Sequence, residues 1–265
     1  MTHGSRTTTG DLVPRYLVPF HPKRIPHYFT DVLIIGGGLA GLRAANAVDS
    51  KQSVLVVTKD ALQQSNSNFA QGGIAGVMDP EDRFEDHIAD TLTAGGRLCD
   101  RSIVEMVIRE APERINDLIH WGTNFDRESG TLILGREAGH SHHRIVHALG
   151  DATGKEVMRA VIEWTQRLRN VEIRERAFTL DLLSHEGTCR GALIADVHGN
   201  KFLVWAKQTI LLPEALARST ASRPTRPSQR ETVMRSRSVR GPSFVTWSSF
   251  NSIRPCCTLP AAAAA

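Results

Sequence analysis

Residues 32–41 read VLIIGGGLAG, and they constrain the fold more than any other segment of the chain. Four apolar residues typical of a strand lead into a glycine turn, and a helical pattern follows over residues 42–48. The glycines fit G-x-G-x-x-G, which permits a sharp turn, close approach of the backbone to a pyrophosphate, and close packing of the helix. The helix N-terminus then offers free N–H groups to phosphates. The segment predicts a dinucleotide-binding turn, although such glycines also occur in plain turns.

A second apolar strand over residues 53–58 follows after one helix, as a βαβ unit requires. The dinucleotide pattern usually ends this strand in an acidic residue, which binds the ribose hydroxyls. Here the strand ends in Thr58 and Lys59. This ending disfavours a plain NAD site, so the adenosine must be held in another way.

The rest of the body alternates helical and strand patterns, with one polar loop and one histidine-rich loop. Helices are expected over residues 82–96, 101–110, 112–121 and 153–169. Asp100 caps the second of these, Pro112 begins the third, and Thr153 with Glu156 forms a capping box for the last. Strands are expected over residues 171–176, 179–184, 190–197 and 202–211, with a hairpin turn at 197–201. The expected class is α/β, a Rossmann-like domain with a β-meander.

Composition limits the class of protein. The chain has 265 residues, 41% of them hydrophobic, which suits a globular protein with a real core. No stretch approaches the roughly 20 apolar residues of a membrane span, and residues 1–29 lack the apolar centre of a secretory signal. Four cysteines show neither metal nor disulfide spacing. We expect a cytoplasmic protein that does not enter a membrane, with residues 1–29 as a partly ordered arm.

The character of the sequence changes abruptly at residue 212. Residues 212–265 hold eight arginines and two acids, whereas the remainder holds 24 basic and 26 acidic residues. Half of the 12 prolines lie in this segment, which has no hydrophobic period and is disordered by composition. It could be an arginine-rich arm for nucleic acid, but codon degeneracy favours a change of reading frame. Read in a shifted frame, the codons for residues 246–255 can encode MEFVQFHPT. Because the arginines are then attributed to the change of frame, no nucleic-acid partner is predicted.

Two loops in the body are candidate sites. Residues 66–73 form a polar loop ending in two glycines, which is either a surface turn or a loop held against a flat cofactor ring. A second loop contains His140, His142, His143 and His147. No cysteine lies near these histidines, and Glu137 is the sole acid beside them, so no metal site is predicted. Long irregular loops of this kind often carry functional residues.

Five motifs identify a resemblance that covers about residues 31–211: VLIIGGGLAGL, NFAQGGIA, DTLTAGGRLCD, GREAGHSHHRIVHA and DATGKEV. With them the chain resembles the L-aspartate oxidases of the succinate dehydrogenase/fumarate reductase flavoprotein family. The resemblance implies that residues 30–211 are part of an FAD-binding domain. The cofactor residues it implies are Gly36, Gly37, Gly38, Leu39, Ala40, Gly41, Lys59, Asn66, Ser67, Asn68, Phe69, Ala70, Gln71, Gly72 and Gly73. Lys59 would lie by the adenosine ribose. Asn66 matches a histidine that bonds to the flavin in succinate dehydrogenases, so the FAD is expected to be non-covalent.

Glu137 carries the implied substrate. Its carboxylate would face the ammonium group of L-aspartate, a contact worth about 1.5–3 kcal/mol, although it could also be an exposed loop acid. The implied reaction gives iminoaspartate for quinolinate synthesis, with a functional link to quinolinate synthase and with oxygen or fumarate as electron acceptor. The catalytic arginine and carboxylate-binding histidines of the family would lie beyond residue 211, so this chain is expected to be an inactive fragment. Two alternatives stay open: a fumarate reductase or succinate dehydrogenase type of enzyme, and a non-enzymatic FAD-binding protein.

Overall fold

The computed structural model of the chain describes residue 16 and residues 18–212. Two expectations from the sequence fall largely outside this range. They are the start of the N-terminal arm and the segment after Leu212 in which we expect disorder and a change of reading frame. The nucleotide sequence across the codons for residues 210–213 tests the change of frame directly.

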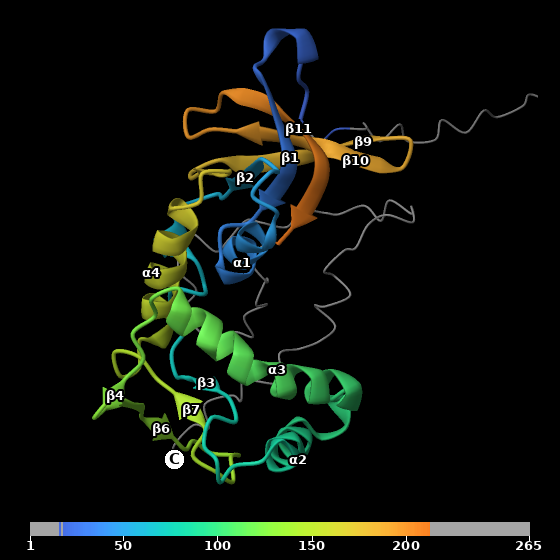
Figure 1. Cartoon of the computed structure of the whole chain (residues 1–265). Coiled ribbons are helices and arrows are strands. Elements are labelled where there is room, and N and C mark those ends of the chain that lie inside the picture. The colour runs from blue at the N-terminus through green and yellow to red at the C-terminus, as the bar shows by residue number, and fades with distance from the viewer. Residues whose placement is uncertain (1–15, 17, 213–265) are drawn as a thin grey trace, which may run out of the picture.

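A six-stranded sheet in the order β8-β2-β1-β11-β10-β9 forms the upper part of the described chain in the view of Figure 1. Its strands are β1 (His27–Ile35), β2 (Val54–Val57), β8 (Val171–Arg174), β9 (Phe178–His185), β10 (Thr188–Ala195) and β11 (Lys201–Leu211). The four strands β8, β2, β1 and β11 run parallel, whereas β10 is antiparallel to both β9 and β11. The predicted α/β class with a β-meander is confirmed.

The neighbouring strands β1 and β2 are covered on both faces, as their continuous apolar runs indicate. Even-numbered residues of β1 and β2 pack toward α1 (Leu39–Ala47), and odd-numbered ones pack toward the meander. β1 begins at His27, inside the range that the sequence assigns to the arm, and its first four residues pair with β11. The apolar pattern does not reveal this part of the strand because those residues are exposed or half-buried.

The helices lie below the sheet in the view of Figure 1. α1 and α4 (Thr153–Gln166) contact each other, α4 contacts α3 (Arg101–His120), and α3 contacts α2 (Phe84–Gly95). Three short 3-10 helices are described: η1 (Pro22–Arg24), η2 (Leu62–Gln64) and η3 (Gly96–Leu98). The helices expected before and after the glycine-rich stretch at residues 95–96 are confirmed, because α2 ends at Gly95 and Asp100 caps α3 through the N–H groups of Ser102 and Ile103.

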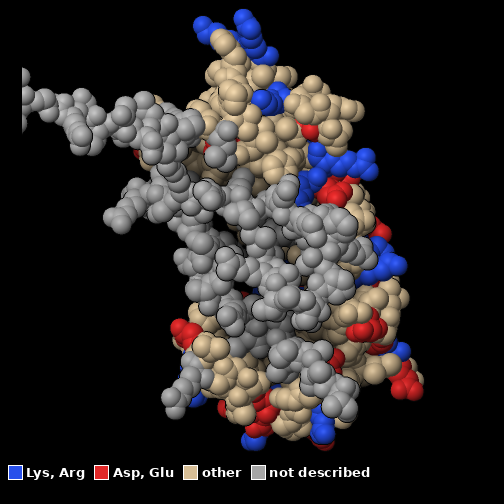
Figure 2. Space-filling view, turned by 180° about the vertical axis from the view of Figure 1, so that it is seen from behind, with Lys and Arg blue, Asp and Glu red and all other residues tan. Residues whose placement is uncertain are grey.

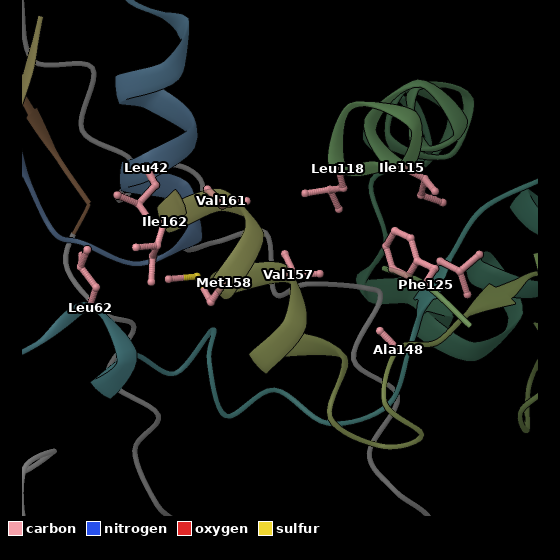
Figure 3. Packing of buried hydrophobic residues seen from close by; sticks show 11 residues of the cluster. Leu42, Leu62, Ile115, Leu118, Phe125, Ala148, Val157, Met158, Val161 and Ile162 are labelled. Atoms are coloured by element: carbon pink, nitrogen blue, oxygen red, sulfur yellow. The ribbon is translucent and has the colours of Figure 1, made fainter. Parts of the chain in front are cut away.

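A buried apolar cluster joins three helices (Figure 3). Leu42 of α1 lies near Met158 and Ile162 of α4 at one end, and Ile115 and Leu118 of α3 lie at the other. Burying a side chain of this size stabilises a fold by about 1.5–3 kcal/mol. The cluster therefore holds α1 and α4 firmly beneath the carboxyl end of the central strands.

The break predicted before Pro112 is absent, and that prediction is wrong. α3 continues through Pro112, which cannot donate a backbone hydrogen bond to the preceding turn. Four apolar residues from both halves of the helix are buried, and their burial offsets the missing bond. They are Val104, Ile108, Ile115 and Leu118.

The capping box predicted at α4 is also wrong. The N-cap residue is Ala152, and no side chain caps the helix. The Thr153 hydroxyl instead accepts a hydrogen bond from the Ala148 N–H at 3.1 Å, and the Glu156 carboxylate accepts one from the Asn124 N–H at 2.8 Å. Both side chains are buried, and neither caps the helix. The Glu156 carboxylate also accepts hydrogen bonds from the Arg159 guanidinium of the same helix, at 2.8 and 2.7 Å.

A small second sheet brings two distant segments together. Its strands are β3 (Ile74–Ala75), β7 (Ile145–Val146) and β6 (Leu134–Gly135), in the order β3-β7-β6, and β4 (Arg127–Glu128) pairs with β5 (Thr131–Leu132) nearby. β3 follows the polar loop, and β6 precedes Glu137. Figure 2 shows basic side chains beside acidic ones over much of the described outline of one face, as expected for a nearly neutral body.

Candidate functional site

The chain turns sharply between β1 and α1. Gly36 has a φ of +121°, and a Cβ there would collide with the carbonyl oxygen of Leu212. A Cβ at Gly41 would collide with the carbonyl oxygen of Gly36, so the helix approaches the strand this closely only because glycine is present. The cap residue of α1 is Gly38, which has no side chain to satisfy the first N–H groups of the helix.

A cavity of about 310 Å³ opens at this turn, at the carboxyl end of the parallel strands. Its wall contains residues 36–41, together with Lys59, Asn66 and Ser67. The volume lies within the range of roughly 300–1,000 Å³ that is usual for small-molecule sites. The structure therefore gathers the glycine turn, the end of β2 and the start of the polar loop in one place. Residues 68–73 lie outside this wall.

One wall of the cavity comes from the connection between β8 and β9, which the sequence did not single out. Ala177, Phe178 and Thr179 line the cavity. This segment lies beside the end of β2. The Thr58 N–H donates to the Arg174 carbonyl oxygen at 3.0 Å, and the Ala177 N–H donates to the Thr58 carbonyl oxygen at 2.9 Å. No local motif marks these residues, since their place depends on the pairing of β8 with β2.

The first half of the polar loop is fastened to two helix N-termini. The Ser67 hydroxyl accepts a hydrogen bond from the Leu39 N–H of α1 at 3.2 Å. The Gly154 N–H of α4 donates to the Ala70 carbonyl oxygen at 3.1 Å, and a Cβ at Gly154 would collide with the Ser67 carbonyl oxygen. The loop therefore lies directly against α4.

The second half of the loop runs into the small sheet. The Gly72 N–H donates to the Asp151 carboxylate at 2.6 Å, and Ile74 pairs with Val146 of β7. A Cβ at Gly73 would lie only 2.9 Å from the His147 ring. The loop thus spans from the cavity at one end to β7 at the other.

Glu137 lies at this far end of the loop and not in the cavity. Its carboxylate Oε1 is 3.7 Å from Nε2 of His147, and its side chain is 54% exposed. The same oxygen would be 3.9 Å from a Cβ on Gly72. The structure therefore brings Glu137 beside Gly72 at the end of the polar loop, with the His147 ring as a neighbour.

A buried charge cluster fastens the histidine-rich loop to α2. Arg144 is fully buried, and its guanidinium donates to both carboxylate oxygens of Asp82, at 2.9 and 2.8 Å. A third guanidinium nitrogen donates to Asp90 at 2.8 Å, and the same Asp90 oxygen accepts from the N–H and the hydroxyl of Ser141 at 2.7 Å. Paired and hydrogen-bonded in this way, the buried charges hold the loop in one position.

Two histidines border this cluster. The His87 and His140 rings lie 5.6 Å apart. Burial, and then the positive charge of Arg144, lower the pKa of His87 to about 4, and burial likewise lowers the pKa of His140. We conclude that both rings are neutral at pH 7.

The described residues include one group with metal-ligand atoms close together, formed by Asp82, Asp86 and His142 within 4.8 Å of one another. Both carboxylate oxygens of Asp82 already accept hydrogen bonds from Arg144. This donor set is therefore poorly suited to a cation, and we assign no metal to it.

Comparison with known proteins agrees with this geometry. The family model described as "FAD binding domain" matches residues 31–242, a range that runs past Leu211, where the sequence predicts the change of frame. The chloroplastic L-aspartate oxidase of Arabidopsis thaliana is 42% identical over 189 residues, which cover 69% of this chain and 29% of that protein. The L-aspartate oxidase of Mesorhizobium japonicum is 40% identical over 180 residues, which cover 68% of this chain and 35% of that protein.

The chain spans about a third or less of the length of these curated relatives. Two solved structures share the fold. The match to E. coli quinol fumarate reductase FrdA has a TM-score of 0.67 at 26% identity, and it covers 71% of this chain and 33% of the FrdA chain. Mycobacterium smegmatis Sdh1 has a TM-score of 0.64 at 29% identity, covering 71% of this chain and 34% of its own.

None of the helices that the structure describes combines the length and the apolar character needed to cross a bilayer. The sheet, the glycine turn and the matched range agree with one another. The chain belongs to the FAD-binding domain family, and over about 70% of its length it is similar to L-aspartate oxidases.

Proposed function

We propose that residues 30–211 are the FAD-binding part of an L-aspartate oxidase, in which residues 36–41, Lys59 and residues 66–73 hold the cofactor. The observation that carries the proposal is the cavity between the glycine turn and the start of the polar loop. Gly38 fits a diphosphate, because a Cβ there would meet only the Ser67 hydroxyl, at 3.4 Å, which leaves the backbone open to a ligand. FAD bound there would supply the oxidation chemistry, and the protein would orient the substrate.

The cofactor is non-covalent in this proposal, because the amide of Asn66 cannot form the bond that a histidine ring makes. The test uses the purified 265-residue chain, reconstituted with FAD and freed of excess cofactor. We expect a yellow protein that releases all of its flavin into the supernatant after acid precipitation. A chain that stays colourless after reconstitution would contradict the cofactor site, and flavin in the acid pellet would contradict the non-covalent assignment.

We propose L-aspartate as the substrate because Glu137 places a carboxylate beside the end of the cofactor loop, where it can pair with an ammonium group. Aspartate added to the FAD-loaded chain should perturb the visible spectrum of the flavin. Glu137→Gln should weaken this response about 10- to 100-fold, which corresponds to one charge-assisted bond. Glu128→Gln, at an exposed acid of β4, is the matched control and should leave the response unchanged.

The same titration separates the alternative, an enzyme of the fumarate reductase or succinate dehydrogenase type, which the likeness to FrdA supports. That alternative predicts that succinate perturbs the flavin more strongly than aspartate and that Glu137→Gln matters little. A flavin that responds to neither ligand would contradict aspartate binding by this chain, and would agree both with an inactive fragment and with a non-enzymatic FAD-binding protein. For the complete enzyme we propose oxygen or fumarate as electron acceptor, a functional link to quinolinate synthase and a cytoplasmic location.

A further inference from the structure

His147 lies in a slot between two glycines from different segments. A Cβ at Gly73 would be 2.9 Å from its ring carbon Cε1, and a Cβ at Gly135 would be 3.0 Å from its Nε2. Both distances are shorter than ordinary contacts, so the ring packs closely against both glycines. A Cβ at Gly73 would also collide with the Ile145 side chain and the Val146 carbonyl oxygen, so β7 as a whole approaches this glycine closely. The ring therefore separates the end of the polar loop from the strand that leads to Glu137.

The backbone beside His147 is held on both sides. Val146, its neighbour in β7, pairs with Ile74 of β3 and with Leu134 of β6, and the His147 carbonyl oxygen accepts a hydrogen bond from the Asp126 N–H at 2.8 Å. The backbone of His147 is accordingly held at the end of β7 in the small sheet. Glu137, by contrast, is 54% exposed, so its side chain loses rotamer freedom when it takes one position.

Two charged side chains near this point are already engaged, and the His140 ring, on which the charge of Glu137 also acts, packs against His87. Arg144 is occupied by Asp82 and Asp90, and Asp151 accepts the Gly72 N–H. Among the described residues, the His147 side chain lies within ion-pair distance of the Glu137 carboxylate, with 3.7 Å between Nε2 and Oε1. A distance of this size exceeds a hydrogen bond, and contacts of catalytic groups commonly shorten when the ligand binds.

We propose that His147 is a positioning residue that directs the Glu137 carboxylate toward an ammonium group on the substrate. The inference rests on the proposed function and adds a specificity determinant to it. His147 occupies a fixed place against the end of the cofactor loop, and its Nε2 limits the positions that the Glu137 carboxylate can take. His147 thereby selects for an amino dicarboxylate over a dicarboxylate that lacks the ammonium group.

The test titrates the FAD-loaded chain with L-aspartate and, separately, with succinate while the visible spectrum of the flavin is followed. His147→Leu removes the ring nitrogens with a side chain small enough for the slot, and His147→Gln retains an N–H donor. We expect His147→Leu to weaken aspartate binding about tenfold or more, to change succinate binding less than twofold, and to leave FAD affinity unchanged. We expect His147→Gln to bind aspartate within about threefold of the parent chain.

The matched control is His143→Leu, at an exposed histidine of the same loop, which should bind both ligands like the parent chain. The proposal is overturned if His147→Leu binds aspartate normally, if it loses aspartate and succinate equally, or if His147→Gln fails to restore binding. A parent chain that takes up FAD but ignores aspartate overturns the proposed substrate and this inference together. A loss in Glu137→Gln without a loss in His147→Leu overturns the inference alone.

Discussion

Replacing Gly38 by alanine should separate the role of the glycine turn in folding from its role in cofactor binding. Gly38 has φ −74° and ψ −177°, a conformation that alanine adopts without strain. A Cβ there would meet only the Ser67 hydroxyl, at 3.4 Å, which is an ordinary contact. The free energy of unfolding should therefore stay within about 1 kcal/mol of the parent, or rise slightly because alanine restricts the unfolded chain.

The same methyl group would lie in the wall of the cavity, between the N-terminus of α1 and a bound diphosphate. Losing one hydrogen bond from a backbone N–H to a charged phosphate costs about 1.5–3 kcal/mol. This cost corresponds to a roughly 10- to 100-fold weaker affinity for FAD. Urea unfolding without cofactor would measure stability, and quenching of flavin fluorescence on titration would measure affinity.

Gly41→Ala is the contrasting variant. Its Cβ would collide with the carbonyl oxygen of Gly36, so α1 must shift away from β1 at a cost of about 1–3 kcal/mol. A Gly38→Ala chain that unfolds like the parent and binds FAD with unchanged affinity would refute the assignment of the cavity. Equal destabilisation by both variants would refute the division of roles among the glycines.

Three further predictions concern the scaffold, and urea unfolding checks each of them. The free energy of unfolding should fall as the pH is lowered from about 6.5 to about 4, because His87 takes up a proton at its ordinary pKa in the unfolded chain and only near pH 4 in the folded chain. His87→Gln should flatten this pH dependence, and an unchanged slope would contradict the lowered pKa of His87. Arg144→Met should destabilise the chain by about 3–5 kcal/mol by leaving the buried Asp82 unpaired, and a change below 1 kcal/mol would show that the cluster is open to water. Pro112→Ala should stabilise it by about 1–2 kcal/mol by restoring the missing bond in α3, and destabilisation would mean that the proline is needed there.

Local sterics explain what the sequence predicts well. The strand, glycine turn and helix at residues 32–48 depend on neighbours within a few positions, and so does the turn at residues 196–200, where Gly199 has a φ of +80° and Asp196 accepts two N–H groups. The meander follows from consecutive strands joined by tight turns. These elements appear where the pattern of residues places them, within a few residues at their ends.

Tertiary contacts explain what the sequence predicts badly. Thr153 and Glu156 have the spacing of a capping box, yet their partners are the N–H groups of Ala148 and Asn124 and, for Glu156, the Arg159 guanidinium. A hydroxyl or a carboxylate accepts a hydrogen bond from whichever donor the fold brings near, and spacing alone cannot show which donor that is. Pro112 failed as a helix boundary for the same reason, since burial of both halves of α3 outweighs one missing bond.

Part of the candidate site can likewise be predicted from local motifs, and part depends on tertiary contacts. The glycine turn, Lys59 and the start of the polar loop follow from motifs, whereas residues 177–179 join the cavity only because β8 pairs with β2. The contact between Glu137 and His147 likewise needs β6 and β7 to be adjacent, although both residues lie in the histidine-rich segment between β6 and α4.

The polar loop between the cavity and Glu137 has no regular structure of its own, so its position depends on distant segments. α1 holds it through Ser67, the N-terminus of α4 holds it at Ala70, and Asp151 holds it at Gly72. Two of these three supports lie more than 75 residues later in the chain. Loss of the contacts from Gly154 and Asp151 would leave the loop with one of these three supports. The affinity of a cofactor that contacts the loop therefore depends on whether α4 is packed against the loop. FAD binding and the docking of α4 should accordingly be coupled, even though no residue of α4 lines the cavity.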